Sequence, residues 1–273
     1  MTDTIATALA AARVRLPADE QDDAQWLLAA LLGKSRSYLY SWPDTPLASA
    51  DRQAFFDMVH RRASGEPLAY ITGEQPFWTL QLAVSPAVLI PRPETELLVE
   101  AILQAHPPAP LTVVDAGTGS GAIALALASE RPHWQLVATD RSAAALQVAA
   151  ANSRRYDLPV RFVQANWLAA VADNSLDVLV SNPPYIAAGD SHLPALRHEP
   201  LSALVAGADG LDDIAVICRQ AARVLKPGGR LYIEHGYDQG QAVAACFATN
   251  GLVDVVCQRD LAGHQRFTSG ARP

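Results

Sequence analysis

The sequence predicts an α/β protein with a mostly parallel sheet, preceded by a small helical domain. From Leu111 onward, strand-like and helix-like segments alternate with short connections, which is typical of a parallel sheet covered on both faces. Residues 1–74 lack this alternation and are typical of helices. Half of the 273 residues are hydrophobic, which is ample for a packed core and excludes a disordered chain.

The helical domain is expected over residues 1–74. The segment Asp19–Leu32 starts with acidic residues and continues with an apolar face that Gly33 ends, which predicts a helix. Ser49 or Asp51 is placed to cap a second helix that runs to about residue 63. Nothing in this region resembles a reaction centre, so we expect a packing or docking domain.

Residues 75–92 are expected to connect the helical domain to a second domain over residues 93–273. Two short apolar runs on either side of Ser85-Pro86 predict a β-hairpin or an extended connector. Prolines then precede the segment ETELLVEAIL, which predicts a helix with proline near its first turn.

The second domain is expected to alternate strands and helices. Strands are predicted over residues 111–117, 134–140, 160–166, 176–182, 229–236, 253–261 and 265–270, and helices over 121–130, 142–155, 212–226 and 241–251. Ligands bind such sheets at the carboxyl ends of the strands, near the point where the strand order reverses. The informative motifs are therefore expected at strand ends.

The composition of the chain argues against several classes of protein. The 21 basic and 28 acidic side chains give a net charge of -7, which argues against a protein that binds mainly nucleic-acid phosphates. Cys218, Cys246 and Cys257 form no CxxC motif or Cys/His cluster, so neither a zinc site nor a disulfide framework is expected. The N-terminus is a poor signal peptide, and no apolar run is long enough to span a bilayer. A cytoplasmic protein without a membrane partner is the expectation.

A glycine-rich turn, DAGTGSG at residues 115–121, follows the first strand of the second domain. Glycines there let the backbone approach a ligand, and Asp140 at the next strand end is placed to bind ribose hydroxyls. The same spacing fits a dinucleotide pattern, so the glycines alone do not separate NAD from S-adenosylmethionine. Asp115 favours S-adenosylmethionine. The alternative is a tight connection with no ligand.

The segment QANWL, residues 164–168, follows the third strand. Asn166 or Trp167 is placed to flank an adenine ring, although a lone tryptophan is more often a core residue.

The motif Ser181-Asn182-Pro183-Pro184-Tyr185 ends the fourth strand and is the sharpest signal in the chain. Two consecutive prolines make a stiff corner that offers acceptors and no N–H donors. The Asn182 side-chain oxygen and the Pro183 carbonyl can receive both hydrogens of one planar NH2 group, and Tyr185 supplies a flat face beside it. An amide or an aminopurine nitrogen fits such a site, and a Pro-Pro turn without function is the alternative.

The chemistry follows from the poor reactivity of an amide nitrogen, whose lone pair is delocalised into the carbonyl. No Cys–His pair or metal cluster is evident, so no metal is expected. A reactive sulfonium methyl donor would supply the chemistry, and the protein would align the nitrogen with the methyl carbon.

The combination of DAGTGSG, NPPY, IPRPETELLVE and LYIEHG resembles the bacterial peptide chain release factor N5-glutamine methyltransferases, the HemK/PrmC family. The resemblance covers nearly the whole chain, and IPRPET with the helical N-terminal domain makes it more specific than NPPY alone. It implies a class I S-adenosylmethionine-dependent methyltransferase fold, Rossmann-like, with seven strands and a final antiparallel hairpin. It also implies N5-methylation of the glutamine in the GGQ motif of class 1 release factors, with the helical domain helping to recognise that partner.

The resemblance also implies roles for individual residues. S-adenosylmethionine would be bound by Gly117, Thr118, Gly119, Ser120, Gly121, Asp140, Trp167 and Asn182, and the glutamine amide by Asn182, Pro183, Pro184 and Tyr185. Asn182, Pro183 and Tyr185 would be the catalytic residues, and Arg92, Pro93, Glu94 and Thr95 match a motif near the active site, where Glu94 or Thr95 is expected to face the cofactor. Asn166 departs from the family, in which the residue before the tryptophan is commonly acidic.

Four alternatives stay open. Ribosomal-protein glutamine methyltransferases share NPPY, but RPET is not expected in them. The acidic net charge argues against an adenine methyltransferase. The intact NPPY motif argues against a non-catalytic binding module that senses S-adenosylmethionine. The lack of a hydride-transfer constellation argues against an NAD-dependent oxidoreductase. The segment His198-Glu199-Pro200 shapes a loop over the site or is simply a solvated loop, and His192 and His235 are polar residues near motif ends.

Overall fold

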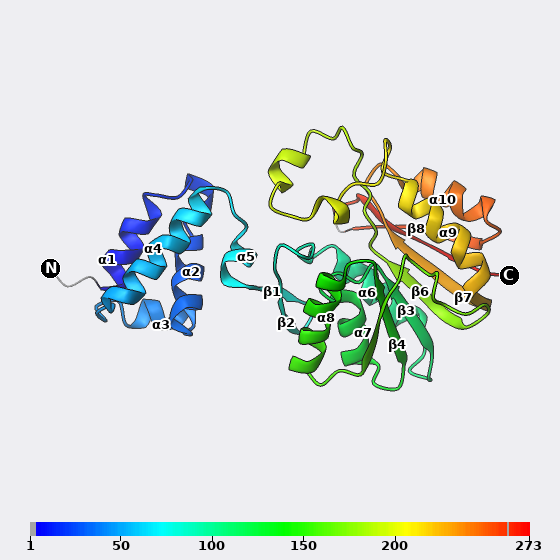
Figure 1. The fold of residues 1–273 in the computed structure, drawn as a ribbon, viewed down its shortest axis with the longest axis horizontal. Coiled ribbons are helices and arrows are strands. Elements are labelled where there is room, and N and C mark those ends of the chain that lie inside the picture. The colour runs from blue at the N-terminus through cyan, green and yellow to red at the C-terminus, as the bar shows by residue number, and fades with distance from the viewer. Residues whose placement is uncertain (1–3, 261) are drawn as a thin grey trace. The chain divides into compact units, whose positions relative to one another are not determined.

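The computed structural model describes residues 4–260 and 262–273. Residues 1–3, with which the predicted helical domain begins, and Leu261, which ends the strand predicted over residues 253–261, lie outside the described residues. The chain forms two compact units, Met1–Glu74 and Gln75–Pro273 (Figure 1).

The first unit is helical. Its elements are α1 (Ile5–Arg13), η1 (Ala18–Glu20), α2 (Asp23–Leu32), α3 (Arg36–Ser41), α4 (Ser49–Ala63) and α5 (Leu68–Thr72). Ile5, Leu27, Leu28 and Phe55 are fully buried in its core, which explains why the apolar residues of α1, α2 and α4 recur at helical spacing.

Two details of the first unit differ from the expectation. The helix predicted over Asp19–Leu32 is interrupted, because a 3₁₀ turn ends at Glu20 before α2 begins. Its predicted end is confirmed by Gly33, which adopts a left-handed conformation with φ 60°. The helix predicted to start near Ser49 starts there, but Ala48 is its N-cap and makes no side-chain capping bond. Neither Ser49 nor Asp51 therefore caps it.

A short hairpin opens the second unit, with β1 (Glu74–Phe77) and β2 (Leu80–Ala83). The chain turns at Trp78, which has φ 56°, and not at Ser85-Pro86 as the apolar runs suggested. A side-chain oxygen of Glu96 accepts the Trp78 N–H at 2.8 Å and thereby fixes the turn. Ser85-Pro86 lies after the second strand, in the segment that leads to the first helix of the sheet domain.

A seven-stranded sheet forms the centre of the second unit, in the order β5-β4-β3-β6-β7-β9-β8. Its strands are β3 (Thr112–Ala116), β4 (Gln135–Asp140), β5 (Val160–Gln164), β6 (Leu176–Ser181), β7 (Leu225–Glu234), β8 (Val253–Arg259) and β9 (Gln265–Ala271). In this order, each strand from β5 through β4, β3 and β6 pairs in parallel with the next one up to β7. The strand β9 pairs antiparallel with both β7 and β8. The mostly parallel sheet with a final antiparallel hairpin is confirmed.

Helices cover both faces of this sheet (Figure 1). They are α6 (Thr95–Ala105), α7 (Ala122–Glu130), α8 (Ala143–Arg155), α9 (Asp212–Val224) and α10 (Gly240–Thr249). One buried cluster joins α6 and α7 to the sheet, and a second joins α9 and α10 to the opposite face. The helix predicted to reach Lys226 ends at Val224, because Pro227 disfavours helical geometry in the residue before it, and β7 begins at Leu225.

The strand order reverses between β3 and β6, the first and fourth strands of the sheet in chain order. These two strands pair with Asp115 opposite Val180, so the turns that follow them emerge side by side. Ser181 pairs with Ile233, which brings the ends of β6 and β7 together as well. The carboxyl edge of the sheet therefore gathers the glycine turn, Asp140, the NPPY corner and the end of β7.

A long loop, residues 186–211, follows the NPPY corner and includes the 3₁₀ helices η2 (Leu193–Leu196) and η3 (Leu201–Ala203). Ile186 and Val205 form a parallel bridge that closes the loop on itself. Among the described residues, no helix is both long enough and apolar enough to cross a membrane.

Candidate active site

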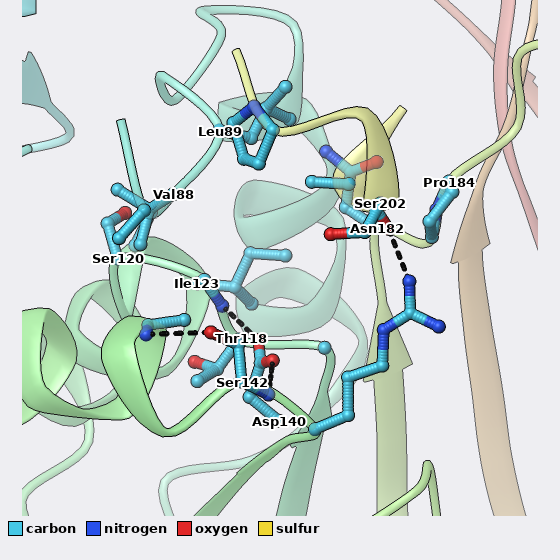
Figure 2. A pocket seen from close by; sticks show the side chains of 18 of the residues that line it. Val88, Leu89, Thr118, Ser120, Ile123, Asp140, Ser142, Asn182, Pro184 and Ser202 are labelled. Carbon is cyan, nitrogen blue, oxygen red and sulfur yellow. Dashed lines mark hydrogen bonds between the residues drawn. The ribbon is translucent and has the colours of Figure 1, made fainter. Parts of the chain in front are cut away.

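A solvent-open cavity of about 950 Å³ lies at the carboxyl edge of the sheet. Figure 2 shows Asp140 and Ser142 toward one end of it, with Asn182, Pro184 and Ser202 toward the other. Its lining includes the predicted residues Thr95, Gly117, Thr118, Gly119, Ser120, Asp140, Trp167, Asn182 and Pro184.

Asp140 is held by backbone donors on both of its oxygens. Oδ2 accepts the Gly119 N–H at 3.0 Å, and Oδ1 accepts the Ser142 N–H at 2.8 Å. Each carboxylate oxygen has a second acceptor position, so the fixed carboxylate can still receive donors from a ligand.

Asp115 is a buried carboxylate beneath the glycine turn. Its Oδ2 accepts the Thr118 hydroxyl at 2.6 Å and the Ala124 N–H at 3.2 Å, whereas Oδ1 has no hydrogen-bond partner among the described residues. Burial raises the pKa of Asp115 to about 7, against the opposing effect of its two hydrogen bonds. A positively charged ligand nearby would stabilise the ionised form.

Trp167 lies across the glycine turn. A Cβ at Gly117, which has φ 78°, would lie 2.9 Å from the Trp167 ring, so only glycine fits there. The indole Nε1–H donates to Asp213 Oδ1 at 3.2 Å. Trp167 both lines the cavity and packs against the core cluster of α9 and α10, so it contributes to the cavity wall and to the core at once. The neighbouring Asn166 is exposed and also lines the cavity.

A second cavity of about 500 Å³ lies next to the NPPY corner. Arg92, Pro183, Tyr185 and apolar side chains of the 186–211 loop contribute to its lining, and Asn182 lines both this cavity and the larger one. Asn182 thus stands where the two spaces meet.

Only the nitrogen of the Asn182 carboxamide has a hydrogen-bond partner among the described residues. Its Nδ2 donates to Thr95 Oγ1 at 3.3 Å, while Oδ1 is buried with no hydrogen-bond partner in the described part of the chain. A buried acceptor without a partner is unfavourable, so a ligand donor at this point would be favoured. Beside it, burial, with a further contribution from Glu234, raises the pKa of Tyr185 above its ordinary value and keeps the phenol neutral.

Two predicted site residues lie outside both linings. Gly121 is the N-cap of α7, with φ 86°, and supports the turn from behind. Glu94 is exposed, and Thr95, the other residue expected to face the cofactor, lines the larger cavity. No group of three or more His, Cys, Asp or Glu side chains within residues 4–260 and 262–273 is placed to hold a metal ion.

Arg141 and Ser202 were missed from the sequence, whereas the role of Glu199 was left open. Arg141 donates to the Ser202 carbonyl at 2.9 Å and so joins the end of β4 to the 186–211 loop. The buried Glu199 in that loop accepts the Ile90 N–H at 3.1 Å and pairs with Arg92. These contacts answer the open question about the segment around Glu199: it packs onto the site. Arg141 could have been noticed because it follows Asp140, but Ser202 has no motif around it.

Comparisons with known proteins agree with this geometry. The PrmC N-terminal domain matches residues 6–73, and the methyltransferase small domain matches residues 93–203. A release factor glutamine methyltransferase of Xylella fastidiosa is 48% identical over 269 residues, 97% of each chain. Those of Coxiella burnetii and Escherichia coli are 45% and 43% identical over 91–92% of this chain and 91% of their own.

The chain belongs to the release factor glutamine methyltransferase family. It is therefore a methyltransferase with S-adenosylmethionine as its cofactor, as the sequence predicted.

Solved structures share the fold over most of the chain. A methyltransferase from Pyrococcus furiosus has a TM-score of 0.55 at 17% identity and covers 79% of this chain and 98% of its own. The Thermus thermophilus 16S rRNA N2 G1207 methyltransferase, solved with AdoMet and guanosine, has a TM-score of 0.56 at 17% identity, covering 73% of this chain and 50% of its own. At these identities the likeness concerns the fold alone.

Proposed function

We propose that this family member transfers a methyl group from S-adenosylmethionine to the N5 amide nitrogen of the glutamine in the GGQ motif of class 1 peptide chain release factors. The observation that carries the proposal is the position of Asn182, which lines both cavities and has a buried acceptor oxygen with no partner among the residues that the structure describes. A donor NH2 placed in the smaller cavity would meet that oxygen at the border of the larger one.

The larger cavity suits a cationic nucleoside. Asp140 is fixed by two backbone N–H groups and keeps acceptor capacity for ribose hydroxyls. The buried Asp115 lies directly beneath the glycine turn, and one of its oxygens has no partner within residues 4–260 and 262–273. S-adenosylmethionine carries a positive sulfonium and an ammonium group, whereas the pyrophosphate of NAD would add negative charge beside these carboxylates. The charge of the site therefore favours S-adenosylmethionine.

The NPPY corner suits a carboxamide. Asn182 Oδ1 and the Pro183 carbonyl would accept one N–H each, and half-buried Tyr185 would lie against the amide plane. Leu89, Leu196 and Leu204 line the same cavity and offer apolar contacts to the methylene groups of a glutamine stem. A glutamate in place of glutamine would bring acceptors to acceptors and would lack the nitrogen.

The residues of this chain contribute alignment rather than covalent chemistry. When bound, S-adenosylmethionine would supply an electrophilic methyl group and would keep its sulfur as a neutral thioether. The amide nitrogen would give up one proton to solvent, which reaches the open cavity. Asn182 and Pro183 would hold the N–H groups from one side and leave the nitrogen lone pair facing the methyl donor. Such alignment contributes several kcal/mol, up to about 7–11 in ideal cases.

The helical first unit is proposed to bind remote surfaces of the release factor. It is a separate compact unit, and the PrmC N-terminal domain matches it. Binding energy from remote contacts can position a reacting amide, so an intact release factor should be a far better acceptor than a short GGQ peptide. Because release factors act in translation, we propose that the reaction occurs in the cytoplasm, with no direct nucleic-acid or membrane partner.

The proposal is tested with purified enzyme, radiolabelled S-adenosylmethionine and an intact class 1 release factor. We expect one methyl group per release factor, placed by mass spectrometry on the GGQ glutamine. A release factor with glutamate at that position should remain unlabelled. Efficient labelling of DNA adenine or of a ribosomal protein in place of the release factor would overturn the substrate assignment. Binding of S-adenosylmethionine without transfer to any of these acceptors would favour a sensor.

A further inference from the structure

Glu234 is a buried carboxylate that the proposed chemistry does not use directly. It ends β7 and is only 4% exposed. Because Ser181 pairs with Ile233, Glu234 and Asn182 are the next residues along two neighbouring parallel strands. Its Oε2 is buried without a hydrogen-bond partner within the described residues. Burying a carboxylate in such a place is unfavourable in free energy, so we looked for a function that would explain it.

Thr95 and Asn182 both lower the pKa of the Glu234 carboxyl group, and the register of β6 and β7 places Asn182 beside Glu234. The Thr95 hydroxyl also accepts from Asn182 Nδ2 at 3.3 Å. The three side chains come from the start of α6 and from the ends of β6 and β7. Thr95 and Glu234 are buried, and Asn182 is half-buried at the border of the two cavities. An ionised carboxylate is purely an acceptor, so the group that faces it must be a donor.

The need for a donor next to the Glu234 carboxylate selects one orientation of the Asn182 carboxamide. Nδ2 donates to Thr95, and Oδ1 has no hydrogen-bond partner among the described residues, so it is free to accept. The flipped carboxamide would set its oxygen against the carboxylate and would present an NH2 to the substrate NH2, donor against donor. An amide oxygen and an amide nitrogen are nearly equal in size, so charge and not shape must select between the two orientations.

We propose that Glu234 is a positioning residue of the methyl-transfer site, which holds Asn182 with Nδ2 toward the protein and Oδ1 toward the substrate amide. The proposal rests on the proposed function, since it assigns a role toward the same amide. Glu234 touches neither substrate nor cofactor in this scheme and acts through Asn182 and Thr95.

The protonation state of Glu234 matters for this role. Burial raises the pKa of Glu234 to about 7, while Thr95, Arg266 and Asn182 lower it and Glu94 raises it further. Tyr185 also faces it and stays neutral, because burial and Glu234 raise the phenol pKa. The neighbouring His235 turns toward Thr268 instead, with 2.9 Å between Nε2 and Oγ1, and burial lowers the pKa of His235. Once protonated, Glu234 can donate to Asn182 Oδ1 and so permit the flipped orientation.

The central experiment is a double-mutant cycle on turnover with the intact release factor and saturating S-adenosylmethionine. Glu234→Gln should reduce kcat about 10- to 100-fold, with the Kd for S-adenosylmethionine unchanged within about twofold. Asn182→Ala together with Glu234→Gln should be no slower than Asn182→Ala alone, because Glu234 acts only through Asn182. Losses that multiply in the double variant would overturn the proposal.

The thermal stability of the Glu234→Gln variant distinguishes a positioning role of Glu234 from a structural role. Since burial penalises the charged form, Glu234→Gln should have a Tm at pH 8 that is equal to or higher than that of the wild type, although it turns over more slowly. Tyr232→Phe is the matched control, because Tyr232 lies on the same face of β7 and its hydroxyl bonds His106, at 3.0 Å, outside the site. Its kcat should stay at the wild-type value. A Glu234→Gln variant with a lowered Tm and a proportionate loss of active protein would show a structural role instead.

Two further readouts keep the proposal testable if Glu234→Gln folds poorly. Thr95→Val keeps the shape of the side chain but removes the second acceptor of Asn182, and it should also lower kcat. In the wild type, kcat should rise with pH through about 7 as Glu234 ionises, and Glu234→Gln should lack this rise. A wild type that fails to methylate release factors refutes the proposed function, whereas an active wild type with an unaffected Glu234→Gln variant refutes only this inference.

Discussion

Asp140 Oδ2 accepts a hydrogen bond from the backbone N–H of Gly119 at 3.0 Å, which ties the end of β4 to the turn after β3. The second oxygen of Asp140 accepts the N–H of Ser142, the N-cap of α8. One carboxylate therefore fixes the glycine turn and the start of a helix while it faces the larger cavity. Binding residues that are held in this way lose little entropy when the ligand arrives.

We predict that Asp140→Ala weakens S-adenosylmethionine binding about 10- to 150-fold, the range expected for the loss of charge-assisted hydrogen bonds worth about 1.5–3 kcal/mol. Isothermal titration calorimetry on the folded variant measures the change. Asp57→Ala, which removes an exposed carboxylate on α4, is the control and should bind like the wild type. Equal affinities for Asp140→Ala and the wild type would remove Asp140 from the cofactor site.

A second prediction separates backbone strain from ligand contact at Gly119. Gly119 has φ 55° and Gly251 has φ 80°, and a Cβ at either position would meet nothing within 4 Å. Gly119→Ala and Gly251→Ala should each therefore lose about 1–2 kcal/mol of unfolding free energy to left-handed strain. Gly119 lines the cavity and Gly251 does not, so only Gly119→Ala should weaken S-adenosylmethionine binding. Denaturant unfolding and calorimetry on both variants decide this, and equal effects on binding would contradict it.

The sheet and the motifs at its edge were predictable because both depend on local patterns. Alternating apolar segments marked the strands, and a parallel sheet brings the residues after neighbouring strands to one edge. The prediction that the DAGTGSG turn and NPPY would meet there required no knowledge of side-chain packing. The hairpin turn at Trp78 was missed because a tryptophan with φ 56° has no turn signature and is held by Glu96, which is distant in sequence.

The supporting contacts of the site could not be predicted, because they join residues far apart in the chain. Arg92 and Glu199 are an example: the arginine belonged to a recognised motif, but its buried partner lies between two short 3₁₀ helices of a loop that is distant in sequence. Glu234 was part of LYIEHG, yet only the register of β6 and β7 places it beside Asn182. Motifs thus identify the groups that face a ligand, and the three-dimensional structure is needed for the groups that orient them.

A third prediction concerns the pH dependence of cofactor binding. The pKa of Asp115 is raised to about 7 by burial, and a positively charged ligand should lower it. Binding should therefore release a proton near pH 6–7, and the affinity should increase as pH rises through about 7 and then level off. Calorimetry in buffers of different ionisation enthalpy measures the proton release.

Asp115→Asn is the matched variant for this prediction, since it keeps the shape of the side chain and cannot ionise. It should bind S-adenosylmethionine more weakly above pH 7 and should show no proton release. The same pKa also bears on stability: because the folded-state pKa exceeds the ordinary value of 3.8, the folded chain binds more protons, and this contribution to stability decreases as pH rises from about 4 to 7. An unchanged proton release in Asp115→Asn would assign the titration to another group.

The last prediction concerns Asn182→Asp. From the motif alone, aspartate keeps an acceptor and should retain more turnover than Asn182→Ala. The structure reverses this expectation, because aspartate loses the Nδ2 donor to Thr95 and sets a second carboxylate beside the buried Glu234. Two carboxylates in one buried site cannot both ionise at neutral pH. We therefore expect Asn182→Asp at pH 7.5 to turn over no faster than Asn182→Ala.

Adding Glu234→Gln to Asn182→Asp replaces one carboxylate by an amide whose NH2 can donate to the new aspartate. This double variant should recover at least about tenfold in kcat, the equivalent of one interaction of about 1.4 kcal/mol. Single-turnover rates with the intact release factor measure all three variants, and an Asn182→Asp enzyme that approaches the wild-type rate by itself would contradict the proposed arrangement.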